Sequence, residues 1–253
     1  MTKENHWKTI ALFIIFFSIG LIPHCMPHRL IFQIAAANIT ILIAYSVYSK
    51  CKPDGPIFSN PVGLAIGFLI TALFSTLTYG VLYLTTQPNL LDNYFTSDLL
   101  FSSLVFSAST STFEEFIFRG PLLLIQKIRF QSRLINASMI TLQALLFGAA
   151  HYNPYRPIIF CLSAFTLGLL LGLISLHLRS LWIGIGLHAG WNFVACIANG
   201  IHLGSYMNLP GALSVGEAGM TTKKALTLIF PLAGLAVYFS LKIHRTKLQR
   251  ALC

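Results

Sequence analysis

The sequence predicts an all-α, polytopic membrane protein with about eight transmembrane helices and an intramembrane polar cavity. Of its 253 residues, 55% are hydrophobic and only 9% are charged, whereas soluble globular domains average roughly 25% charged residues. The apolar residues also fall in long, continuous runs. Such runs favour helices, because a spanning helix needs ~20 apolar residues and the strands of a membrane barrel alternate apolar and polar positions.

The predicted helices follow the apolar runs. In chain order, these runs are residues 9–22, 30–48, 62–86, 99–125, 134–150, 157–178, 181–201 and 225–241. Segments rich in Pro and Gly separate several of them, as expected for loops. The longest polar stretch, 204–224, shows no strong period, and no internal repeat or soluble domain is visible. We therefore expect one integral membrane domain over residues 1–253.

The basic residues predict the orientation. With the N-terminus in the cytoplasm and eight crossings, twelve Lys and Arg residues fall on the cytoplasmic side and four on the opposite side. Because Lys and Arg gather in cytoplasmic loops, we expect both termini in the cytoplasm and an integral protein of a bacterial inner (plasma) membrane. No basic cluster is interleaved with aromatic residues, so membrane lipid, and not nucleic acid, is the expected partner.

Two further features exclude other classes. The first run is followed by Pro23 and His24 in place of a small-residue cleavage site, which favours an uncleaved helix over a signal peptide. The five Cys residues are scattered without a CxxC pair, so neither a disulfide framework nor a zinc–cysteine site is expected.

The fourth run carries three charged residues. Glu114, Glu115 and Arg119 lie within six positions, where each ionisable residue costs ~3 kcal/mol or more in the bilayer. Glu115 and Arg119 are four apart, so they share a helix face and can pair, whereas Glu114 is rotated about 100° away. Either the three residues form a packing network, or Glu114 is held free for chemistry; the second glutamate favours the latter.

Polar residues on two later runs complete the candidate site. His151 follows Phe147 by one helical turn at the end of the fifth run, and His188 and Asn192 are four apart on the seventh. A single intramembrane His is often only a helix contact, but four such side chains from three helices indicate a shared cavity. His151 lies toward the outer end of the fifth run and His188 within two turns of the inner end of the seventh. Tilted helices, a shifted boundary or a re-entrant break would bring the two side chains to the same depth.

These residues resemble the CAAX protease and bacteriocin-processing (CPBP, or Abi) family of intramembrane endopeptidases. The family pattern is EExxxR, FxxxH and HxxxN or HxxxD on successive membrane helices. The matching residues are Glu114, Glu115, Arg119, Phe147, His151, His188 and Asn192. Each motif is weak alone, but all three in order within apolar helices are specific. The resemblance covers about residues 102–201, and the protease-like core is expected at about 99–201.

The resemblance implies a glutamic intramembrane protease that hydrolyses a peptide bond within or near the membrane. It implies that Glu114 is the general base that activates water and that His151 helps to hold this water. His188 and Asn192 would stabilise the oxyanion. Donors aimed at a developing oxyanion commonly lower the barrier by ~3 kcal/mol each.

The resemblance assigns Glu115 and Arg119 a supporting role and leaves a metal open. No cofactor is favoured, although zinc is possible because Glu and two His can bind it with an open fourth position. Its ligands would be Glu114, His151 and His188. HExxH is absent, and the expected pairing of Glu115 with Arg119 would oppose a nearby cation, so we favour a metal-free, only metalloprotease-like mechanism.

Two classes of function remain at this stage. The first is a CPBP-type protease acting on a membrane-associated peptide or protein, such as a prenylated chain, a bacteriocin leader or a sorting-related propeptide. The second is a non-catalytic immunity factor or transporter that keeps the polar cluster for ion or peptide binding. The intact motif set favours the protease.

Overall fold

The computed structural model describes residues 61–86, 89–90, 96–120, 122–123, 133–152, 158–202, 208–210, 213–214, 231–236 and 238. Its helices are α3 (Val62–Thr86), α4 (Ser97–Phe118), α6 (Arg133–Ala150), α7 (Ile159–Leu178) and α8 (Leu181–Asn199). Its strands are β1 (Asn89–Leu90), β2 (Gly200–His202), β3 (Asn208–Pro210) and β4 (Leu213–Ser214). The expected helices at 9–22 and 30–48, and most of the one at 225–241, lie outside these residues.

Three of the described helices are long and apolar enough to cross a membrane. They are residues Val62–Val81 of α3, all of α7 and all of α8. This confirms a helical protein with membrane-span candidates, while the total of about eight helices remains a prediction. Large apolar side chains are exposed along α3, such as Leu69 and Leu73 at 67% and 65%, as expected for a surface that faces lipid.

The ends of the helices differ slightly from the apolar runs. α3 coincides with its run, but α4 starts earlier because the Thr96 side chain accepts a hydrogen bond (3.1 Å) from the Leu99 amide and caps the helix. α7 ends at Arg179, which adopts a left-handed conformation with φ of 51°. α8 begins two residues later, at Leu181.

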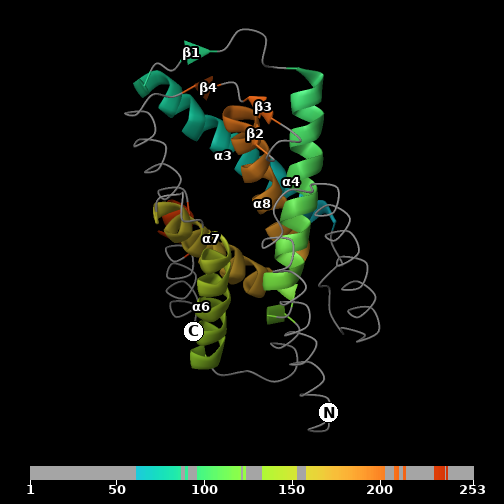
Figure 1. The fold of residues 1–253 in the computed structure, drawn as a ribbon. Coiled ribbons are helices and arrows are strands. Elements are labelled where there is room, and N and C mark those ends of the chain that lie inside the picture. The colour runs from blue at the N-terminus through green and yellow to red at the C-terminus, as the bar shows by residue number, and fades with distance from the viewer. Residues whose placement is uncertain are drawn as a thin grey trace, which may run out of the picture.

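Four strands of two or three residues accompany the helices without changing the expected all-helical class. β1 pairs with β4, and β2 pairs with β3, both antiparallel, at the end of the molecule where α4 begins (Figure 1). The expected helix at 181–201 therefore stops at Asn199, because residues 200–202 pair as β2. The polar stretch beyond 204 contributes β3 and β4, whose pairing the sequence did not indicate.

α3 and α8 pack face to face with their backbones in close contact. A Cβ on Gly67 would lie 2.6 Å from the Ile183 carbonyl oxygen, and a Cβ on Gly186 would overlap the Leu64 carbonyl. Small residues at four-residue spacing allow such an approach between membrane helices. Contacts advance in the same direction on both helices, from Gly63 with Ile183 to Tyr79 with Asn199, so α3 and α8 are parallel.

α4 crosses α8 in the opposite direction. Glu115 contacts His188, and Ser111, one turn earlier on α4, contacts Asn192, one turn later on α8. α6 packs against α7, where Gln143 donates a 2.8 Å hydrogen bond to the Gly168 carbonyl. The C-terminal half of α4 thus contacts α8, and the end of α6 meets both helices through Phe147 and His151, which places the three motifs together.

Candidate active site

The C-terminal half of α4 buries its charged residues completely. The exposed fractions are 3% for Glu114 and 0% for both Glu115 and Arg119. Phe113, Phe116, Ile117 and Phe118 around them are also buried. This segment is therefore buried on all sides of the helix and not on one face alone.

Glu115 is the centre of an ion-pair network. Its Oε1 lies 3.0 Å from Arg119 NH1 and 2.9 Å from His188 Nδ1. A carboxylate only accepts hydrogen bonds, so Nδ1 of His188 is the donor. Glu115 therefore fixes the orientation of the His188 ring and directs its Nε2 toward Glu114. The expected Glu115–Arg119 pair is present.

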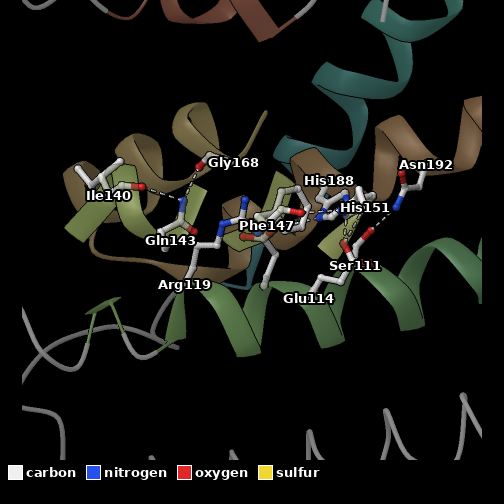
Figure 2. Close-up of polar contacts among 11 residues, drawn as sticks. Ser111, Glu114, Arg119, Ile140, Gln143, Phe147, His151, Gly168, His188 and Asn192 are labelled. Carbon is white, nitrogen blue, oxygen red and sulfur yellow. Dashed lines mark hydrogen bonds and ion pairs between the residues drawn. The ribbon is translucent and has the colours of Figure 1, made fainter. Parts of the chain in front are cut away.

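Glu114 faces both histidines (Figure 2). Its Oε2 lies 3.6 Å from His188 Nε2 and 4.0 Å from His151 Nε2. Among the described residues this oxygen has no hydrogen-bond partner. Oε2 of the side chain predicted to remain free for chemistry is thus buried, without a hydrogen bond from the described residues, and flanked by two imidazoles.

His151 is held by Phe147, its partner in the second motif. The Nδ1 of His151 donates to the Phe147 carbonyl at 2.8 Å, because a carbonyl can only accept. The Phe147 ring lies 4.6 Å from the His151 ring and 5.8 Å from the His188 ring, centroid to centroid. Arg119 lies 4.3 Å over the same ring as a cation–π contact. Phe147 therefore packs among the charged residues of the site.

Asn192 joins the site through a residue that the sequence did not single out. Its Nδ2 donates to Ser111 Oγ at 3.1 Å, and Ser111 is fully buried one turn before Glu114. The one available signal was the four-residue spacing of Ser103, Ser107 and Ser111, which leads to Glu115. That spacing also suits plain helix packing, so it carried little information.

The predicted residues are brought together across three helices. Glu114 lies within 4.0 Å of an imidazole nitrogen from each of the other two motifs, so His151 and His188 reach the same level. His151 is the most exposed residue of these ion-pair contacts, with 34% of its side chain accessible to solvent. The distances show a compact polar cluster; the cavity and the catalytic roles stay predictions.

The donor set does not fit a metal. Among the residues that the structure describes, no group of three or more His, Cys, Asp or Glu could hold a metal ion. The Arg119 guanidinium beside Glu115 adds a positive charge in the same network. We therefore derive no catalytic step through a zinc ion.

The fold and site define a helical protein with membrane-span candidates and a buried cluster of Glu, His and Arg. Residues 96–194 match the family model described as Type II CAAX prenyl endopeptidase Rce1-like. The match confirms the resemblance over this segment, which contains all three motifs. No curated protein and no solved structure matches the chain significantly.

Proposed function

We propose that the protein is an intramembrane endopeptidase that hydrolyses a peptide bond of a membrane-associated protein or peptide. The observation that carries this proposal is the position of Glu114 Oε2, buried and 4.0 Å from His151 Nε2. That distance is too long for a direct hydrogen bond, and one water admitted between the two atoms would contact both. The family match supports the reaction class.

Glu114 and His151 activate this water. The Nδ1 of His151 donates to the Phe147 carbonyl, so Nε2 of the neutral ring accepts a hydrogen bond from the water. Glu114 then takes a proton as the water oxygen attacks the scissile carbonyl carbon. Proton transfer to a positioned side chain contributes typically 10²–10⁴-fold to a rate.

His188 and Asn192 stabilise the tetrahedral intermediate. Nδ1 of His188 donates to Glu115, so His188 in its imidazolium form carries a second proton on Nε2, which it donates to the oxyanion. Asn192 gives one N–H to Ser111, and the second N–H of the same amide remains available to the oxyanion. When the intermediate collapses, the C–N bond breaks and the leaving amine takes the proton held by Glu114, which restores the carboxylate.

The substrate is proposed from the family description alone. The matching family is named for CAAX prenyl endopeptidases, so the first probe is a farnesylated peptide with a C-terminal CaaX sequence. Bacteriocin leaders and sorting-related propeptides are the other membrane-associated substrates of this class. A comparison of peptide N-termini in membranes with and without the active protein identifies the substrate without prior choice.

The test of the proposal is Glu114→Gln. Gln keeps the size of the side chain but cannot accept the proton, so cleavage should fall by at least ~10²-fold while the protein remains folded. Glu114→Asp should also be poor, because its carboxylate is drawn back by one methylene. The measurement is the rate of cleavage in proteoliposomes and the yield of new N-termini in membranes.

Asp98→Asn is the matched control. Asp98 is an exposed carboxylate in the first turn of the same helix, so its neutralisation should leave cleavage unchanged. A Glu114→Gln variant that produces the same new N-termini at the wild-type rate removes Glu114 from the chemistry and favours the non-catalytic class.

A further inference from the structure

The second carboxylate oxygen of Glu115 has a candidate partner on α7. Oε1 pairs with Arg119 and accepts a hydrogen bond from His188. Oε2, in contrast, is buried without a hydrogen-bond partner among the described residues. A buried carboxylate oxygen left in that state is costly, because removal from water is not compensated. A donor on a neighbouring helix would offset this cost.

Ser175 of α7 is such a donor. It is fully buried, and within the described chain its hydroxyl also has no hydrogen-bond partner. Its backbone is fixed, because its carbonyl accepts the amides of Arg179 and Ser180 in the turn that leads into α8. Only its hydroxyl is left to rotate.

Gly184 of α8 lies between the two unpaired oxygens. A Cβ at this position would be 2.9 Å from Ser175 Oγ and 3.1 Å from Glu115 Oε2. Both oxygens are thus within about one hydrogen-bond length of a single point, which any other residue would fill with carbon. Gly184 is also one turn before His188, whose ring Glu115 orients.

We propose that Ser175 and Gly184 are positioning residues: after rotation of its side chain, the Ser175 hydroxyl donates to Glu115 Oε2, and Gly184 leaves the space for this contact. Ser175 then completes the set of donors around Glu115. A Glu115 carboxylate held through both oxygens maintains its hydrogen bond to Nδ1 of His188. Nε2 of the same ring therefore remains directed at Glu114. This inference rests on the proposed function for its catalytic consequence, but not for its structural one.

The first readout does not depend on cleavage. Magic-angle-spinning NMR of ¹⁵N-histidine protein in lipid bilayers reports which nitrogens of each histidine ring carry a proton. The His188 signals are assigned by their loss in His188→Gln. Wild type should show a protonated Nδ1 at His188. Ser175→Ala and Gly184→Ala should each reduce the population of that form, the first by removing the donor and the second by separating the two oxygens.

The second readout uses a cleaved substrate, with the farnesylated CaaX peptide as the first probe. Ser175→Ala should lower kcat by at least ~10-fold, the rate equivalent of one hydrogen bond to a charged group, with KM within about twofold of wild type because Ser175 does not face the substrate. Failure of wild type to cleave any membrane peptide would refute the proposed function but leave the NMR result valid.

Two variants control for packing. Ser163→Ala removes a hydroxyl on the same helix, which among the described residues donates to the Ile159 carbonyl one turn earlier. Gly63→Ala adds a methyl where the nearest atoms are at an ordinary 3.5 Å. Both should keep the wild-type His188 spectrum and kcat. A wild-type spectrum in Ser175→Ala overturns the inference, as does an equal effect of Ser163→Ala.

Discussion

Arg119 is held inside the protein by two kinds of contact. Its guanidinium pairs with Glu115 at 3.0 Å and lies 4.3 Å over the Phe147 ring. Burial of a charge is offset only when a partner of opposite charge or a polarisable surface replaces water. Arg119 of the EExxxR motif is therefore part of what holds Glu115 in the position from which it orients His188.

We predict that Arg119→Ala destabilises the fold as well as abolishing activity. The change leaves Glu115 buried without its cation, which typically costs ~3–5 kcal/mol. Thermal unfolding and yield in detergent measure the effect. Arg119→Lys should lie between the two, because Lys keeps the charge but loses the planar contact with Phe147. Arg179→Ala, at an exposed arginine, is the control, and wild-type stability of Arg119→Ala would contradict the pairing.

Sequence reasoning identified charged residues more readily than their supports. Glu114, Glu115 and Arg119 stand out because charge is rare in an apolar run, and their spacing predicts the Glu115–Arg119 pair that the structure contains. Ser111, Ser175 and Gly184 do not stand out, because small residues are common in packed membrane helices. Their contacts depend on how separate helices meet, which local spacing does not encode.

At the scale of helices, the apolar runs predict where each helix lies better than they predict the residues at which it begins and ends. The run 62–86 coincides with α3, but 181–201 overruns α8 because its last residues pair as β2. β1 pairs with β4 across more than a hundred residues. Strands of two or three residues have no period to detect, and their stability comes from the partner strand, so the sequence could not indicate them.

The α3–α8 contact predicts unequal responses to two glycine substitutions. Gly186→Ala places a methyl against the Leu64 carbonyl, and such overpacking typically costs ~1–3 kcal/mol. Gly80→Ala faces no atom within 4 Å, so it should be neutral or slightly stabilising, since Ala exceeds Gly in helix propensity by ~1 kcal/mol. Thermal unfolding in detergent compares the two. Equal melting temperatures would show that the close approach of the helices does not exist.

At the scale of the whole molecule, the reaction requires no metal in our proposal. A chelator should leave the cleavage rate unchanged, and purified protein should contain no stoichiometric zinc by elemental analysis. The physical reason is that Glu114 accepts the proton of water directly, with His151 as the second contact. Loss of activity on chelation, restored by added zinc, would instead assign Glu114, His151 and His188 as ligands.

The directions of the helices constrain how the chain threads the membrane. α3 and α8 are parallel, and α4 is antiparallel to α8. Parallel helices require an even number of crossings from the start of one to the start of the other. The expected helices at 62–86, 99–125, 134–150 and 157–178 supply four, so the directions agree with a chain that crosses once per apolar run.

This threading predicts how the protein is oriented in the membrane. If both termini are cytoplasmic, α4 begins outside and runs inward, and Glu114 lies about 25 Å along it at 1.5 Å per residue, in the cytoplasmic half of the bilayer. Arg156 then falls outside and Arg179 inside. In a protein without its native cysteines, Arg156→Cys should react with an impermeant thiol reagent in intact cells, whereas Arg179→Cys should react only after permeabilisation. The reverse pattern would invert the membrane orientation and place the site near the outer surface, although the positions of Glu114, His151 and His188 relative to one another would not change.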